Sequence, residues 1–185
     1  VYVTAESSGA HLNPAVTFAL AAAGKFDWQL VPMYLLAQML GAMFGAFIVW
    51  MIYKDHINEA ESAADQLALF ATGPSIRKLP QNFITETLAT LVFILGILFI
   101  KPADSNLGAL SALPVALLVG GIGFGLGGPT GWAINPARDL GPRIMHYLLP
   151  IKGKGSSDWG YAPVPVFGPI VGGILAGIIY TQFLQ

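Results

Sequence analysis

The tripeptide Asn-Pro-Ala occurs twice in this chain, each time after a short stretch rich in small residues. The first copy lies in SGAHLNPA at residues 8–15 and the second in TGWAINPA at residues 130–137. Both stretches have a hydroxyl side chain, a glycine, three further residues and then Asn-Pro-Ala. A single Asn-Pro commonly begins a turn or a helix, so one copy would carry little weight. Two copies in matching contexts indicate a duplicated functional element.

The chemistry of this motif follows from what asparagine and proline do at the start of a helix. Proline has a preset φ and lacks an N–H, which suits the first helical turn, and asparagine is a preferred N-cap. We therefore predict that each motif starts a helix. The motif residues are Asn13, Pro14, Ala15, Asn135, Pro136 and Ala137.

The residues before each asparagine are predicted to be irregular backbone. At membrane depth such backbone is tolerated only where it is buried in protein or lines an aqueous cavity. Its carbonyl oxygens would form a ladder of hydrogen-bond acceptors, whose members are Gly9, Ala10, His11, Gly131 and Ala133. The asparagine amides would add donors, and two helix N-termini would add partial positive charge. Such a site holds water or a hydroxyl group, whereas a cation meets an electrostatic and dehydration barrier.

The rest of the chain has the composition of a membrane protein. Of its 185 residues, 55% are hydrophobic and 10% are charged, against roughly 25% charged residues in soluble domains. Apolar stretches close to the length of about 20 residues that crosses a bilayer lie at residues 31–53, 83–100, 110–127 and 164–183. We predict each to be a spanning helix. The charged stretch 54–65 should be an aqueous loop, and residues 101–104 and 152–158 should be exposed turns.

Charge and cysteine content exclude several classes of function. The formal net charge is −1 and there is no basic run, so we expect no nucleic-acid partner. The absence of cysteine removes disulfides, thiolate nucleophiles and cysteine metal sites. We find no histidine spacing typical of a metal site, no nucleophile with a base and no phosphate-binding loop. The sequence therefore predicts no metal, no cofactor and no enzymatic activity.

A second sequence similarity between the two halves of the chain supports a duplication. The sequence GAMFGA at residues 41–46 matches GGILAG at residues 172–177 in its small-residue positions. Small residues let helices approach closely in membranes. Such contacts could lie within one subunit or between subunits.

With both motifs, the chain resembles the aquaporin and glycerol-facilitator family, the major intrinsic proteins. The residues that carry the resemblance are SGAHLNPAVT at 8–17 and GWAINPARD at 131–139. It implies an all-α membrane protein with an aquaporin-like right-handed helical bundle, in which two half-helices meet at the bilayer centre. The family has six spans, so the first span and most of the second are expected to be missing. Residues 1–185 are then one transmembrane channel domain, incomplete at its N-terminus.

The resemblance also implies a selectivity constriction. Arg138 matches the pore arginine of the family, and a guanidinium can donate to a passing hydroxyl while repelling cations. The alternative is an arginine that forms a salt bridge, with Asp139 as its neighbour, or that snorkels. Trp132 matches a position where glycerol-conducting members carry Phe and water-selective members a small residue. Gly123 matches a position that is Gly in glycerol-conducting and His in water-selective members. For Trp132 a plain core role, and for Gly123 plain helix packing, remain open.

Glu86 is an acidic residue inside an apolar span and therefore a functional candidate. By resemblance it is a buried carboxylate that accepts hydrogen bonds from the backbone of a half-helix loop, which we favour over proton coupling. His11 is interpreted as a structural histidine.

These observations together predict a passive channel that conducts glycerol, other small uncharged solutes and water while excluding ions and protons. A water-selective aquaporin is the nearest alternative; a non-conducting membrane protein and a coupled carrier are more remote. The resemblance further implies a homotetramer in the lipid bilayer, as a multi-pass protein of the plasma membrane.

Overall fold

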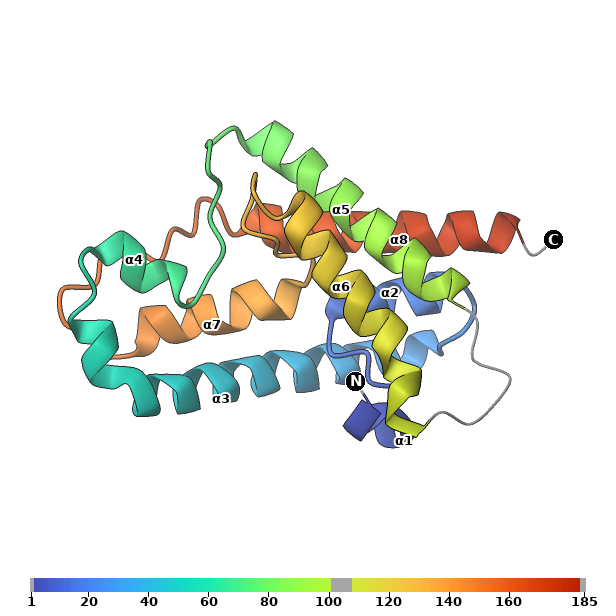
Figure 1. The fold of residues 1–185 in the computed structure, drawn as a ribbon, viewed down its shortest axis with the longest axis horizontal. Coiled ribbons are helices and arrows are strands. Elements are labelled where there is room, and N and C mark those ends of the chain that lie inside the picture. Colours follow the sequence, from blue (N-terminus) through green and yellow to red (C-terminus); the bar gives the residue numbers. More distant parts are fainter. Residues whose placement is uncertain (1, 101–107, 184–185) are drawn as a thin grey trace.

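The structure, a computed structural model, describes residues 2–100 and 108–183, and the regular elements of this part are helices. Figure 1 shows two long layers of helices with shorter segments between them. In chain order the elements are α1 (Tyr2–Ser8), α2 (Pro14–Ala22), η1 (Trp28–Leu30), α3 (Val31–Asn58), α4 (Ala63–Ala68), α5 (Leu79–Phe99), η2 (Gly108–Ala112), α6 (Leu113–Leu126), α7 (Pro136–Leu148) and α8 (Pro163–Gln182).

Three of the four predicted spans are helices long and apolar enough to cross a membrane. They are Trp28–Asn58, which joins η1 to α3, Leu79–Phe99 and Pro163–Gln182. Helix α3 is longer than predicted, because it continues to Asn58 after a local break in helical geometry at Tyr53, where φ is −107° and ψ is 16°. The first part of the predicted aqueous loop is therefore helical, and α4 occupies part of the rest.

The fourth predicted span, 110–127, is an apolar helix over Leu110–Leu126, which is shorter than the other three. Its α-helical part is α6, with 14 residues. Pro114 lies in its first turn, and the chain before it forms the tighter turns of η2. The predicted turn at residues 101–104 lies outside the described residues.

Helix α8 is the centre of the packing, where it contacts α5, α2 and α7. Its glycines allow this, because a Cβ atom added at Gly173 would lie 2.5 Å from the Ala15 carbonyl oxygen. One added at Gly177 would lie 2.5 Å from the Ala19 carbonyl oxygen. The small-residue face of α8 therefore makes contacts inside the chain.

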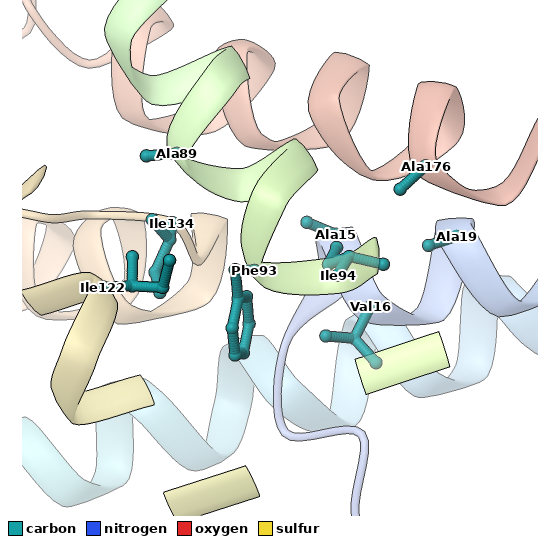
Figure 2. Close-up of a cluster of buried hydrophobic side chains, with 9 residues drawn as sticks. All are labelled: Ala15, Val16, Ala19, Ala89, Phe93, Ile94, Ile122, Ile134 and Ala176. Atoms are coloured by element: carbon teal, nitrogen blue, oxygen red, sulfur yellow. The ribbon is translucent and has the colours of Figure 1, made fainter. Parts of the chain in front are cut away.

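The buried apolar core joins both half-chains. Figure 2 shows side chains of α5 and α2 in the middle of this core, with Ile134 of the segment before α7 and Ile122 of α6 on one side and Ala176 of α8 on the other. The members of this cluster are Ala15, Val16, Ala19, Ala89, Phe93, Ile94, Ile122, Ile134 and Ala176. The core thus fixes the two Asn-Pro-Ala segments relative to the long helices.

Helix α3 lies along α7 and also touches α2. Ala42 is the contact on this side, since a Cβ atom added at Gly141 of α7 would lie 2.7 Å from the Ala42 Cβ. Gly41 and Gly45 have no heavy atom of the described residues within 4 Å of an added Cβ atom. The two small-residue segments therefore differ, because that of α8 is enclosed and that of α3 is partly open.

Candidate functional site

Helices α2 and α7 begin at the two Asn-Pro-Ala motifs, as the sequence predicted. Asn13 is the N-cap of α2, and its side chain accepts a hydrogen bond of 2.8 Å from the Ala15 backbone N–H. Asn135 is the N-cap of α7 and accepts bonds of 3.0 Å and 3.2 Å from the N–H groups of Ala137 and Arg138. Each proline follows its cap at the start of the helix. The prediction that each motif starts a helix is confirmed.

Reciprocal hydrogen bonds join the two helix starts. The Asn13 amide nitrogen donates to the Ile134 carbonyl at 2.9 Å, and the Asn135 amide nitrogen donates to the Leu12 carbonyl at 2.9 Å. Each asparagine therefore caps its own helix with oxygen and holds the opposite loop with nitrogen. An amide nitrogen carries two hydrogens, so each asparagine keeps a second N–H that these bonds do not use.

The backbone before each motif has the same unusual conformation in both copies. The first copy has positive φ angles at Gly9, Ala10 and Leu12, and the second has them at the equivalent positions. The angles are 68°, 51° and 49° in the first copy and 77°, 59° and 42° in the second, which comprises Gly131, Trp132 and Ile134. Positive φ is uncommon for non-glycine residues and persists where the surroundings enforce it, often at functional sites.

Glu86 of α5 holds the second of these segments. Its carboxylate accepts hydrogen bonds from the N–H groups of Ala133, at 3.0 Å, and Ile134, at 2.8 Å. The side chain is 1% exposed. These two bonds occupy two N–H groups of the segment with a side chain from α5. The bonds that the resemblance implied for Glu86 are thus present.

His11 belongs to a polar cluster beside the first segment. Its Nδ1 lies 3.1 Å from the Thr17 hydroxyl, which also accepts a bond of 3.0 Å from the Gln38 amide. The His11 ring packs against Phe26 and Tyr34, with ring centroids 4.7 Å and 5.1 Å away. Among the described residues no group of three or more His, Asp or Glu side chains is placed to hold a metal ion.

A cavity of about 450 Å³ lies between the two segments and helices α5 and α6. Its lining includes residues of both segments together with Phe93, Val119, Trp132 and Arg138. Two further open cavities, of about 770 Å³ and 740 Å³, also reach Arg138. Arg138 therefore belongs to the lining of all three cavities. The alternative of an ion pair with Asp139 is not observed, because the carboxylate of Asp139 pairs with Arg143 at 2.8 Å.

Gly123 of α6 lies directly beneath the ring of Trp132. It is not part of the lining of the 450 Å³ cavity. A Cβ atom added at Gly123 would lie 2.9–3.0 Å from three atoms of the Trp132 ring. The space left by the missing side chain is thus filled by the indole. Gly131 likewise packs away from this cavity, 3.2 Å from the Gly73 carbonyl oxygen when a Cβ atom is added.

Comparison with protein-family profiles gives a match over residues 1–180 to the family described as major intrinsic protein. The chain belongs to this family. Its curated relatives include a probable glycerol uptake facilitator protein of Thermotoga maritima, 49% identical over 181 residues, with 98% of this chain and 77% of the relative covered. The glycerol uptake facilitator protein of Bacillus subtilis is 51% identical over 180 residues, covering 97% of this chain and 65% of the relative.

A solved structure of the same family has a similar fold. The X-ray structure of the aquaglyceroporin from Plasmodium falciparum matches with a TM-score of 0.77 and 34% sequence identity. The match covers 98% of this chain and 74% of that protein. The all-α, aquaporin-like membrane fold predicted from the sequence is therefore confirmed, and this major intrinsic protein chain spans about two thirds to three quarters of the length of the proteins compared here.

One polar network of this major intrinsic protein was missed by the sequence analysis. Asp139 accepts hydrogen bonds from the backbone N–H and hydroxyl of Thr72, at 2.7 Å and 2.6 Å. Arg143 pairs with Asp139 and also donates to the carbonyls of Thr72, Ser157 and Asp158. Asp139 and Arg143 are both 0% exposed. Their spacing of four residues, which places two opposite charges on one helix face, was a signal in the sequence for their pairing.

Proposed function

We propose that the protein is a passive channel that conducts glycerol, other small uncharged solutes and water across a membrane. One observation carries the proposal: two Asn-capped half-helices are joined start to start, beside a cavity that has Arg138 and Trp132 in its lining. The names of the relatives as glycerol uptake facilitators and of the solved structure as an aquaglyceroporin support it.

Conduction follows from the pairing of donors and acceptors along the path. The remaining N–H of Asn13 and Asn135 donates to a solute oxygen at the junction of the half-helices. Carbonyl oxygens of Gly9, Ala10 and His11, and of Ala133 in the second segment, accept from solute hydroxyl groups. A hydroxyl exchanges bonds with water for bonds of similar strength, so the barrier to its passage is low.

Charge exclusion has two sources in this proposal. The first turn of each half-helix carries partial positive charge at the junction, and the Arg138 guanidinium adds a full charge nearby. A cation meets repulsion from both and loses hydration that these donors cannot replace. Chloride and other anions lose their hydration water in the cavity, and its otherwise apolar wall, which includes Phe93 and Val119, does not replace it.

Glycerol is favoured over water alone as the characteristic solute. Glycerol has hydroxyl groups along one edge and carbon atoms along the other, so it fits between a donor and an apolar wall. Arg138 supplies the donor and the Trp132 ring supplies the wall. Trp132 Nε1 is buried and has no hydrogen-bond partner in the described part of the chain, so the indole presents carbon to the cavity. A water-selective channel is the less favoured alternative.

The proposal extends to the setting of the channel. The protein functions as a homotetramer in the plasma membrane, with one pore in each subunit and no enzymatic activity. The long apolar helices support a bilayer location, and the large side chains exposed along α3, such as Met33, Phe44 and Ile52, suit contact with lipid or with other helices.

The proposal is tested on the full-length protein in proteoliposomes by stopped-flow light scattering. Water, glycerol and a larger polyol are compared in one preparation, with protein-free vesicles as the control. We expect glycerol permeability well above the protein-free value and water permeability raised as well. Cross-linking in the same vesicles reports the subunit number. Raised water permeability with glycerol at the protein-free level would establish the water-selective alternative instead.

A further inference from the structure

A polar cavity lies at the first turn of the spanning helix α5, and it shares no lining residue with the 450 Å³ cavity. Its volume is about 580 Å³, and its lining includes Ser75, Lys78, Gln81, Thr85 and Gly128. The Ser75 hydroxyl donates to the Gly128 carbonyl and so ties the loop before α5 to the loop after α6. Figure 1 shows this end of α5 at the outer edge of the fold. The cavity is therefore separate from the proposed solute path and lies at one end of a spanning helix.

Lys78 supplies the charge of this cavity. It is the one charged residue in the described lining, and its ammonium group has no ion pair, hydrogen bond or ring contact within residues 2–100 and 108–183. Its neighbour Arg77, in contrast, is paired with Asp158 at 2.6 Å. Asn82 fixes the backbone of this residue, because its side-chain oxygen accepts a bond of 2.9 Å from the Lys78 N–H. The cavity therefore presents an unpaired cation on a fixed backbone.

The other polar groups of the cavity are neutral. The Gln81 amide offers two hydrogen-bond donors, and the first turn of α5 adds partial positive charge from its backbone N–H groups. The hydroxyls of Ser75 and Thr85 both donate to backbone carbonyls, that of Thr85 to the Gln81 carbonyl at 3.0 Å. Their oxygens therefore remain as acceptors. This combination suits an anionic group that also carries hydroxyl groups.

An apolar stripe on α5 continues from the cavity along the span. Its members Ile84, Leu88 and Val92 are 48%, 53% and 50% exposed, and their spacing of four residues places them on one helix face. Thr85 of the cavity is three residues before Leu88 and therefore belongs to the same side of the helix. The stripe extends for about 12 Å along the helix axis. A charged polar site at the end of a span is thus continuous with apolar surface, which matches the headgroup and acyl chain of a phospholipid.

We propose that this cavity and stripe bind a phospholipid whose anionic headgroup carries hydroxyl groups, of the phosphatidylglycerol type. The phosphate accepts hydrogen bonds from the Lys78 ammonium and the Gln81 amide. The headgroup hydroxyls donate to the oxygens of Ser75 and Thr85, and one acyl chain lies along the stripe. A basic pocket at the end of a spanning helix attracts anionic lipid. A choline headgroup brings a second cation close to Lys78 and has no hydroxyl to donate, so the site discriminates against it.

The experiment measures lipid binding to the full-length protein in detergent by native mass spectrometry, with phosphatidylglycerol and phosphatidylcholine of the same acyl chains. We expect one phosphatidylglycerol per subunit to bind more tightly than phosphatidylcholine. Lys78→Gln should weaken phosphatidylglycerol binding about fivefold, the effect of one lysine at an anionic lipid surface. Lys152→Gln is the matched control, because it removes the same charge from an exposed loop outside this cavity. Gly128→Leu should also weaken binding, since it has open space at Cβ and fills the cavity while Lys78 is kept.

Three results would overturn the inference. Equal effects of Lys78→Gln and Lys152→Gln would mean that surface charge attracts the lipid without a defined site. Soluble glycerol phosphate that raises the melting temperature as much as phosphatidylglycerol at the same concentration would show that the stripe binds no acyl chain. Unchanged lipid binding together with a changed subunit number in Gly128→Leu would assign this face to a neighbouring subunit.

Discussion

At the residue scale, the two asparagines combine structural and functional roles in one side chain. The oxygen of Asn13 caps α2 and its nitrogen holds the opposite loop, and Asn135 does the same from the other side. Fixed in this way, the amides lose little orientational freedom when a solute arrives, which lowers the cost of forming a hydrogen bond. Arg138 differs, because none of the ion pairs of the described residues includes it.

The first prediction concerns Arg138 and the exclusion of cations. Across about 5 Å and an effective dielectric constant of about 20, one guanidinium opposes a cation by about 3 kcal/mol. Arg138→Val should therefore raise proton or cation leak by about tenfold or more while glycerol and water still pass. The measurement is decay of a pH gradient in proteoliposomes, with Arg77→Val as a surface control. An unchanged leak in a folded variant would show that the half-helices alone exclude cations.

A second prediction concerns Glu86, whose two oxygens both accept backbone N–H groups. In Glu86→Gln one oxygen becomes an NH₂ group that faces an N–H group, and a buried donor without an acceptor costs about 1–3 kcal/mol. We expect a lower melting temperature and reduced flux of water and glycerol together, whereas the exposed Glu59→Gln should match the parent. Glycerol flux through the parent should not respond to a pH gradient. A response would favour proton coupling over the structural role.

At the element scale, α7 is fixed at its start by contacts from distant segments and at its end by a nearby lysine. Its start is held by Asn135, and Asp139 and Arg143 in its first two turns bind the loop at Thr72. At the other end the Lys154 ammonium donates to the carbonyls of residues 146, 147 and 149. A cation at a helix C-terminus is favourable because the last carbonyls lack partners. Helix α7 is therefore held in place by residues 67 or more positions away along the chain and by the nearby Lys154.

The third prediction compares the two arginine and aspartate pairs of the chain. Arg143 is fully buried, so Arg143→Met leaves the Asp139 charge without its partner at a cost of about 3–5 kcal/mol. We expect this variant to lose its folded state at a markedly lower temperature than the parent. Arg77→Met is the control, because the Arg77–Asp158 pair is exposed, with 49% and 29% of the side chains accessible. Equal melting temperatures for the two variants would contradict the clamping role of Arg143.

The Arg77–Asp158 pair also makes a prediction about acid. The Arg77 guanidinium donates to both carboxylate oxygens and holds the pKa of Asp158 below its usual value. A carboxyl with a depressed pKa in the folded state contributes stability at neutral pH, and that contribution is lost as pH falls through the folded-state pKa. The difference in melting temperature between the parent and Arg77→Met should therefore shrink on acidification. A difference that stays constant down to pH 3 would contradict this assignment.

Sequence reasoning predicted the elements whose signal is local. The Asn-Pro-Ala starts of α2 and α7 depend on neighbouring residues, and the apolar lengths of α3, α5 and α8 can be counted directly. It failed where distant segments decide the outcome. Thr72 meets Asp139 across 67 residues of chain, and nothing near either residue identifies the other. The direct contact of Gly123 with the Trp132 ring was not predicted for the same reason. Trp132 lies in an irregular segment, and the path of such a segment cannot be derived from periodicity.

At the scale of the whole molecule, the duplicated small residues decide how closely the half-helices approach the spans. Gly173 and Gly177 of α8 let the backbone of α2 come into contact, and Ala42 of α3 meets Gly141 of α7 in the other half. At both crossings, α8 with α2 and α3 with α7, a half-helix therefore packs closely against a long helix because the residues in contact are small. Tight crossings of this kind bring the two Asn-Pro-Ala starts together, so that the reciprocal asparagine bonds form.

The last prediction tests this seating through Gly173. An added Cβ atom there would lie 2.5 Å from the Ala15 carbonyl oxygen, which is backbone and cannot rotate away. Gly173→Ala must therefore push α2 from α8, at a cost of about 1–3 kcal/mol, and it moves Asn13 with it. Because Trp132 and Arg138 of the cavity lining are not changed, the permeability to glycerol and the permeability to water should fall together. Their ratio should stay near that of the parent. Gly125→Ala, in open space on α6, is the control for adding a methyl group to a membrane glycine. A changed ratio with unchanged stability would mean that Gly173 acts on solute selection, and the seating argument would then fail.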